Sequence, residues 1–287
     1  MKPLGVLKQV RDALAHLNPA EVREEARRPF TIQLFARTPE AYEELETWLA
    51  PAELSESRRS EVQSVVHRGA DYSDGTVIRI FDEGMSHTPA DFEFQRGRPE
   101  QVVCDIIERH PEIRLSLARQ LRPFREPVVK NIVRDISKEN ALFSIATALP
   151  DVVPLLSMPW AIGEFASDTA FLTGNQVRMA FMLAAASDRT VGYRKQRAEI
   201  ASLFAGAFGW RAIARELVSK VPFGAGVVPK AAIAFAATYV VGTSLERYYR
   251  IGYGYSATER KDAYQQALER GKEVAAALMK TISPGKA

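Results

Sequence analysis

The 287-residue sequence contains one cysteine and four histidines, and it has no uncharged run as long as a membrane-spanning helix. The single cysteine, Cys104, excludes an internal disulfide and a cysteine-based zinc cluster, and it is typical of a reducing compartment. The histidines all lie within the first 110 residues, and none has the spacing of common zinc or di-iron sites. We therefore expect no metal and no cofactor.

Charge is sparse in one part of the chain. Residues 141–255 carry 7 acidic and 11 basic residues, whereas the other 172 residues carry 55 of the 73 charged side chains. The longest uncharged run, Ala231–Leu245, has 15 residues, short of the roughly 20 that a spanning helix needs. The pattern disfavours a multi-span protein but is compatible with a segment that rests on a membrane or partly inserts into it.

Net charge bears on the possible partners, and the N-terminal residues bear on the location of the protein in the cell. A net charge of +3 is too small to indicate a nucleic-acid partner. The first 17 residues lack the apolar core and cleavage site of a secretory leader. The expected location is cytoplasmic, with a peripheral position at the inner membrane as the membrane-bound form.

The first 120 residues predict a small α/β domain. Phe30–Phe35 and Thr76–Phe81 have the pattern of strands, Phe92–Phe94 fits a third short strand, and residues 57–67 fit either a helix or a strand. Helix starts are indicated by proline or a capping residue at four places: Asn18-Pro19, Thr38-Pro39, Pro99-Glu100 and Pro111-Glu112.

Nucleotide chemistry is not supported in this domain. The connection after the first strand, Ala36–Glu40, has neither the glycines nor the lysine of a phosphate-binding loop. Phe81–Gly84 is one residue short of an Asp-x-x-Gly magnesium loop, and Gly84–Thr88 lacks the final glycine of a nucleophile elbow. We expect no binding of GTP or ATP.

The second half predicts a helical bundle. Three long apolar helices are expected at about 158–187, 196–220 and 228–249, followed by a polar helix that opens with a capping box at Ser256–Glu259. A tight reversal is expected at Pro222, Gly224 and Gly226. The fold class is therefore α+β and mostly α, with domains at 1–120 and 121–287. The charge boundary near Asn140 falls inside continuous helix, which predicts coupled halves rather than a flexible linker.

Small residues recur every four positions on two of these helices, which allows close helix packing in soluble and membrane bundles alike. They are Ala201, Ala205 and Gly209 on one helix, and Ala234, Thr238 and Gly242 on the next.

One candidate polar site lies in the apolar half. Glu164, Asp168 and Asn175 share one face of the first long helix. If these carboxylates are buried, they need partners, and Arg211 and Arg215 are the natural ones because a guanidinium matches a carboxylate. The alternative is that Glu164 and Asp168 face water.

Residues 122–250 resemble the family catalogued as domain of unknown function 697. The matching segments are Asn140-Ala141, Pro150-Asp151-x-x-Pro154, Asn175–Met179, Gly209, Lys220–Gly226 and Ala237–Gly242. The resemblance implies a helical module that follows an Era-like GTPase domain or stands alone in predicted inner-membrane proteins. Residues 1–120 depart from the GTPase-bearing members because the GTPase motifs are missing.

Two functions follow as hypotheses. The first is a non-catalytic, membrane-proximal helical protein that associates with a membrane surface and with another protein. The second is an enzyme with an unrecognised carboxylate and arginine site in the helical half. The sequence names no oligomeric state.

Overall fold

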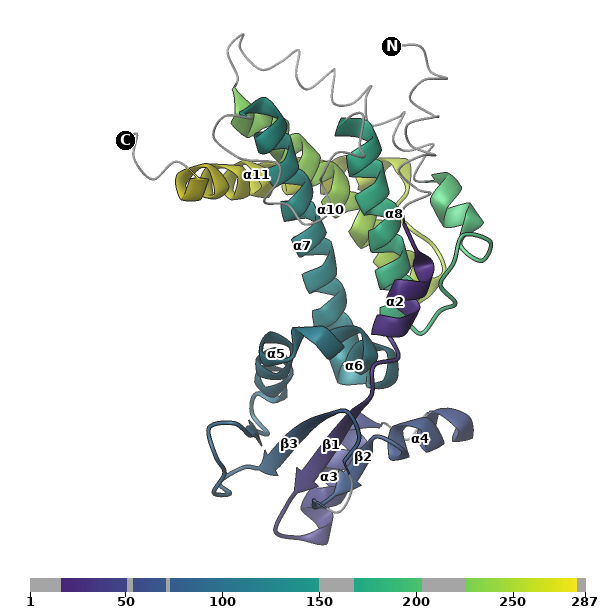
Figure 1. Ribbon diagram of the computed structural model, residues 1–287, viewed down its shortest axis with the longest axis vertical. Coiled ribbons are helices and arrows are strands. Elements are labelled where there is room, and N and C mark those ends of the chain that lie inside the picture. The colour runs from purple at the N-terminus through teal and green to yellow at the C-terminus, as the bar shows by residue number, and fades with distance from the viewer. Residues whose placement is uncertain (1–16, 51–53, 71–72, 150–167, 203–225, 283–287) are drawn as a thin grey trace. The chain divides into compact units, whose positions relative to one another are not determined.

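The computed structural model describes residues 17–50, 54–70, 73–149, 168–202 and 226–282. Its fold is α+β and mostly α, as the sequence predicts (Figure 1). The principal elements, in chain order, are α2 (Pro19–Glu25), β1 (Phe30–Phe35), α3 (Pro39–Leu49), α4 (Glu56–Gln63), β2 (Val66–Arg68), β3 (Thr76–Asp82), β4 (Phe92–Phe94), α5 (Pro99–Arg109), η1 (Pro111–Ile113), α6 (Arg114–Gln120), α7 (Arg122–Ala148), α8 (Asp168–Ala186), α10 (Val227–Ile251) and α11 (Ala257–Ile282).

The chain divides into two compact units. The sheet unit contains residues 20–131 and 184–190, and the helical unit contains residues 1–19, 132–183 and 191–287. The boundary therefore falls within α7, between residues 131 and 132, rather than at residue 120. The segment 184–190 belongs to the sheet unit although it lies within the charge-poor part of the sequence, residues 141–255. Local sequence patterns do not reveal this assignment, because it depends on contacts between distant residues.

A four-stranded parallel sheet in the order β2-β1-β3-β4 forms the centre of the sheet unit (Figure 1). Phe30 to Leu34 are all buried, because β1 is an inner strand of a parallel sheet. Hydrogen bonds compensate its two buried polar side chains. Thr31 donates to the Asp74 carbonyl and accepts from the Asp74 N–H, and Gln33 accepts from Arg79.

Local capping chemistry sets several helix starts. Thr38 accepts a hydrogen bond from the Ala41 N–H and Pro39 opens α3, as the sequence predicts. The segment 57–67, which fits either a helix or a strand in the sequence, contains one after the other. The helix α4 begins after its cap, Ser55, and the short strand β2 follows it. Pro111 opens a short 3-10 turn, and the α-helix α6 begins at Arg114.

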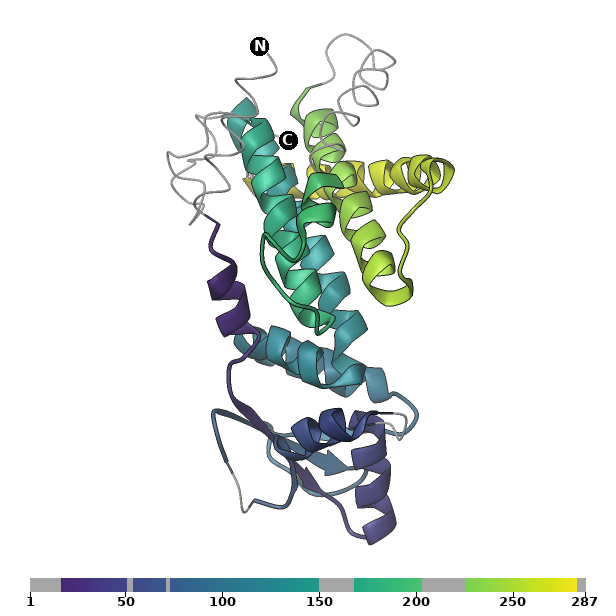
Figure 2. The same ribbon diagram turned by 90° about the vertical axis from the view of Figure 1, so that its right-hand side faces the viewer.

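Most of α7 and α8, together with α10 and α11, makes the helical unit, and α11 crosses α10 (Figure 2). One buried cluster joins Ala141 and Ile145 of α7 to Phe235 of α10 and Ala275 of α11. A second joins α10 to the first half of α11 through Val240 and its neighbours. This unit is the predicted helical bundle.

The three predicted apolar helices are described to different extents. The third corresponds to α10, and the first corresponds to α8 from residue 168 onward. The second is helical over residues 197–202, and the rest of it lies outside the described residues. Within the described residues, α10 is the one helix that is long and apolar enough to cross a membrane, and 44% of its most apolar stretch is buried.

Candidate functional site

The predicted carboxylate and arginine site is only partly described. Glu164, Arg211 and Arg215 lie outside the described residues, as does the side chain of Asp168. Asn175 is described and buried on α8. The proposed pairing of these carboxylates with these arginines therefore stays a prediction.

Asn175 belongs to a buried chain of hydrogen bonds that joins three helices. Its Nδ2 donates to Asn140 Oδ1 on α7 at 2.8 Å, and Asn140 Nδ2 donates to Thr238 Oγ1 on α10 at 2.7 Å. Thr238 in turn donates to the Ala234 carbonyl at 2.9 Å. Asn140 and Thr238 are fully buried, and Asn175 is 4% exposed. We call Asn140, Asn175 and Thr238 the amide network.

The amide network fixes helix positions instead of presenting reactive groups. Each bond between its side chains is directional and runs between two helices, so it sets how the helices are turned toward one another. Its amide and hydroxyl groups carry no charge and accept or donate to one another.

An arginine–carboxylate pair does join α7 and α8, but with residues other than those predicted. Arg178 Nη2 lies 2.9 Å from Glu139 Oε2, and both side chains are about three-quarters buried. Glu139 precedes Asn140 and Arg178 follows Asn175 by three residues, so the pair lies beside the amide network. The three-residue spacing of Asn175 and Arg178 indicates that they lie on the same side of α8, but only the structure identifies Glu139 as the partner of Arg178.

The predicted packing rows are placed differently. Ala234, Thr238 and Gly242 are all buried on α10. A Cβ at Gly242 would lie only 2.7–2.9 Å from Val133 of α7 and Met179 of α8, so the glycine allows a close approach. Ala201, in contrast, is exposed. The buried residue in that turn of the helix is its neighbour Ile200, so this face of the helix does not pack as predicted. Ala205 and Gly209 lie outside the described residues.

The predicted reversal is described at one position. Gly226 is exposed and caps the start of α10 in an extended conformation. Pro222 and Gly224 lie outside the described residues.

Gln196 is the centre of a second group of buried hydrogen bonds in the helical unit. Its Nε2 donates to the Ala180 carbonyl and to the Tyr249 hydroxyl, both at 2.9 Å. Its Oε1 accepts from the Gly192 N–H at 3.1 Å. Gln196 thereby connects the loop after α8 with both α8 and α10.

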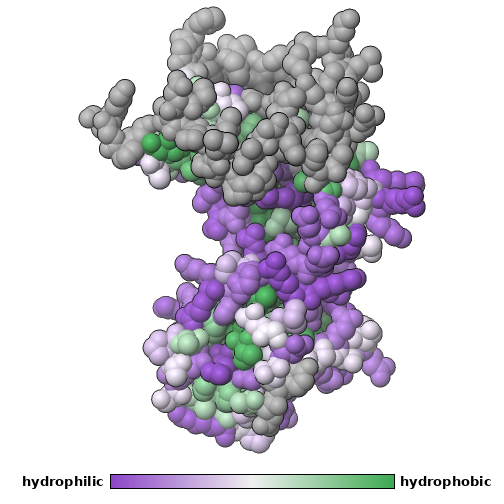
Figure 3. All heavy atoms as spheres, viewed as in Figure 1, coloured by the Kyte–Doolittle hydropathy of each residue, from purple (hydrophilic) through white to green (hydrophobic). Residues whose placement is uncertain are grey.

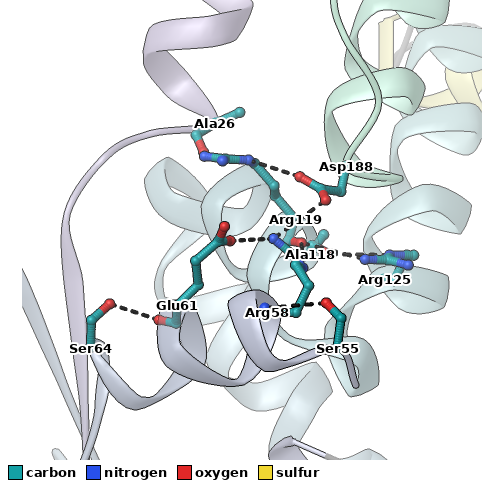
Figure 4. Close-up of polar contacts among 9 residues, drawn as sticks. All are labelled: Ala26, Ser55, Arg58, Glu61, Ser64, Ala118, Arg119, Arg125 and Asp188. Atoms are coloured by element: carbon teal, nitrogen blue, oxygen red, sulfur yellow. Dashed lines mark hydrogen bonds and ion pairs between the residues drawn. The ribbon is translucent and has the colours of Figure 1, made fainter. Parts of the chain in front are cut away.

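In the sheet unit, arginines surround Asp188 at the C-terminal end of α8 (Figure 4). Arg58 and Arg119 form ion pairs with its two carboxylate oxygens at 3.3 and 3.2 Å, and Arg58 also pairs with Glu61. Asp188 has a φ of 54°, in the left-handed region that often ends a helix. We call Arg58, Arg119, Arg125 and Asp188 the arginine cluster.

Arg125 holds two helix ends together within this cluster. Its guanidinium donates to the Ala118 carbonyl near the end of α6 and to the Ala186 carbonyl at the end of α8. Helix C-termini carry partial negative charge, which favours a cation at this position. Burial lowers the pKa of Arg125, and the nearby positive charge of Arg58 lowers it further, while Asp188 opposes the shift. The arrangement explains why 184–190 belongs to the sheet unit.

The C-terminal ends of β1 and β3 lie where parallel α/β sheets often bind ligands. Here Arg37, which follows β1, donates to the Gly84 carbonyl, which follows β3. Arg96 forms ion pairs with Asp82 at 2.8 Å and with Glu44 at 2.9 Å. These side chains link the two strand ends to each other and to α3. Among the described residues, no group of three His, Cys, Asp or Glu side chains could hold a metal ion.

No family model matches the chain, and neither does any curated protein or solved structure. The resemblance to domain of unknown function 697 therefore stays a prediction.

Proposed function

We propose that the chain is a non-catalytic protein that associates reversibly with a membrane surface through its helical unit. The observation that carries this proposal is the length and apolar character of helix α10. The helix is long and apolar enough to cross a membrane, yet less than half of its most apolar stretch is buried within the protein. The other apolar residues of that stretch are part-buried, and the exposed apolar side chains of the helix lie at its C-terminal end, at Tyr248 and Ile251, which favours association with a membrane through that end.

The packing of α11 against α10 favours peripheral association over a spanning topology. Gly271 lets α11 approach the Ala232 carbonyl of α10, because a Cβ there would lie 2.7 Å from that oxygen. The outer face of α11 is charged and exposed at, among others, Glu269, Lys272 and Glu273. If α10 crossed the bilayer, α11 would carry these charges with it, at a cost of several kcal/mol.

Cell fractionation tests this proposal. We expect the full chain in the membrane pellet at low ionic strength, and its release by alkaline carbonate. Retention after carbonate would show an integral protein. Complete recovery in the cytosolic fraction, together with no binding to vesicles of equimolar phosphatidylcholine and phosphatidylglycerol, would contradict membrane association altogether.

The proposed role for the sheet unit is protein association rather than nucleotide or nucleic-acid binding. Its strand ends are linked by the hydrogen bond from Arg37 to Gly84 and by the ion pair of Arg96 with Asp82. The connection after β1 has neither the glycines nor the lysine of a phosphate-binding loop. The enzymatic alternative depends on Glu164, Asp168, Arg211 and Arg215, and it remains a hypothesis based on the sequence. The proposed location is cytoplasmic and peripheral at the inner membrane.

A further inference from the structure

The exposed large apolar side chains of the described residues gather at one place. They are Tyr248, Ile251 and Tyr253, which are 36%, 42% and 59% exposed. All three lie within six residues at the C-terminal end of α10. Elsewhere, on the face drawn in Figure 3, the described surface is mostly hydrophilic, with apolar residues in small separate areas. We call Tyr248, Ile251 and Tyr253 the α10 tip.

The backbone that carries the α10 tip is firmly held. Gly252 ends α10 in the left-handed conformation, with φ 89°, and its N–H bonds to the Tyr248 carbonyl at 2.9 Å. Three residues after Gly252, the Tyr255 N–H donates to Ser244 Oγ at 3.0 Å. Gly254 packs so closely on Ser244 that a Cβ would lie 2.7 Å from the hydroxyl oxygen.

Side chains complete this support. Arg247 lies over the rings of Tyr253 and Tyr255 and forms an ion pair with Glu259 at 2.7 Å. Glu259 also accepts the Ser256 N–H, and Ser256 Oγ accepts the Glu259 N–H, which completes the predicted capping box. Because these contacts fix the loop, Tyr253 is presented to solvent without the usual freedom of a loop residue.

The composition of the α10 tip fits the interface of a membrane. Tyrosine has an apolar ring and a polar hydroxyl, and it concentrates at the level of lipid headgroups. Arg250 lies between these residues in the sequence and forms an ion pair with Glu246 at 2.8 Å. Because 65% of its side chain is exposed, its guanidinium can also pair with a lipid phosphate.

The size of the α10 tip argues against a protein partner as its main occupant. At the exposures given above, its three residues offer on the order of 300 Å². A stable protein interface takes about 800 Å² from each partner. Shallow insertion of a few aromatic and aliphatic side chains into a bilayer surface requires no such area.

We propose that the α10 tip is the membrane anchor: Tyr248, Ile251 and Tyr253 enter the headgroup region of a bilayer, and Arg250 contacts phospholipid phosphates. This inference rests on the proposed membrane association and names the part of the chain that makes the contact. The charged outer face of α11 stays in water in this arrangement.

Site-specific labelling of the full chain tests the anchor. Cys104, the single cysteine, is exposed and is replaced in Cys104→Ser. An environment-sensitive thiol label is then placed through Tyr253→Cys, with Gln265→Cys on the exposed face of α11 as the matched control. On vesicles of equimolar phosphatidylcholine and phosphatidylglycerol, we expect a blue shift and quenching by headgroup-labelled lipid at position 253 and neither at position 265.

A second measurement uses the unlabelled protein. We expect Ile251→Ser with Tyr253→Ser to weaken vesicle binding about tenfold or more, because the apolar contact is lost. Ala276→Ser with Ala277→Ser, at exposed positions of α11, leaves binding unchanged. Far-UV circular dichroism checks that both variants keep the fold.

The outcomes separate the two proposals. If the chain binds vesicles but the label at position 253 stays in water, or the double serine variant binds as well as the wild type, the anchor is wrong and membrane association stands. If the unlabelled wild-type chain binds neither the lipid vesicles nor the membrane fraction of cells, the proposed membrane association is wrong, and so is the anchor.

Discussion

Replacing Thr238 by valine removes one hydroxyl from the amide network and keeps the shape of the side chain. The hydroxyl accepts from Asn140 Nδ2 at 2.7 Å, and both residues are fully buried. In Thr238→Val this amide N–H loses its acceptor in a place that water does not reach. A buried donor without a partner costs about 1–3 kcal/mol, and the added methyl group offsets part of that loss. We expect a decrease of about 1–2 kcal/mol in the free energy of unfolding.

The matched control is Thr243→Val on the same helix. The Thr243 hydroxyl donates only to carbonyls of its own helix, those of Tyr239 and Val240. Valine and threonine have similar helix propensities, so this substitution should change stability by less than about 0.5 kcal/mol. The difference between the two variants isolates the contact between helices.

Urea unfolding followed by far-UV circular dichroism measures both variants, with the midpoint compared at unchanged slope. Thr238→Ser provides a further check, since it keeps the hydroxyl. Combining Thr238→Val with Asn140→Ala should give less than the sum of the two single effects, because both substitutions break the same bond. Equal midpoints for Thr238→Val and Thr243→Val would show that the amide network does not stabilise the fold as argued.

Three further results are expected. Burial raises the pKa of the Tyr264 hydroxyl from 10.0 to about 12, so its neutral form stabilises the fold below pH 10 and this contribution is lost as the pH rises toward 12. Tyr264→Phe should therefore lose less stability than the wild type between these pH values, as urea midpoints would show. Gly242→Ala should destabilise by about 1 kcal/mol, since the close contacts with Val133 and Met179 outweigh the gain in helix propensity. Calorimetry should detect no micromolar binding of GTP or ATP, and binding that Arg37→Ala abolishes would contradict this.

The two stability predictions can each be contradicted by a specific result. For Tyr264→Phe, equal alkaline losses in both proteins would show that another group titrates in this range. For Gly242→Ala, the exposed substitution Ala276→Gly on α11 gives the propensity effect alone, about 1 kcal/mol. A Gly242→Ala protein more stable than the wild type would show that α7 and α8 yield to the added methyl group.

Local chemistry was sufficient to predict many elements of this protein. The sequence predicts strands at 30–35, 76–81 and 92–94, and the structure has them at 30–35, 76–82 and 92–94. The helix starts at Pro39 and Pro99 are also as the sequence predicts. The capping box at Ser256 and Glu259 was predicted as well and forms in the structure. These features depend on residues that are at most a few positions apart, so a sequence pattern contains the information they need.

Only the tertiary structure decided which distant residues meet. Asn175 lies on the predicted face of α8, but its partner is the uncharged Asn140, and the nearby arginine, Arg178, pairs with Glu139. Likewise, Asp188 follows the end of α8, and the structure surrounds it with arginines from α4 and α6. Such pairings depend on how each helix is rotated about its axis and which elements lie beside it. Both are set by the packing of whole faces, which no short stretch of sequence specifies.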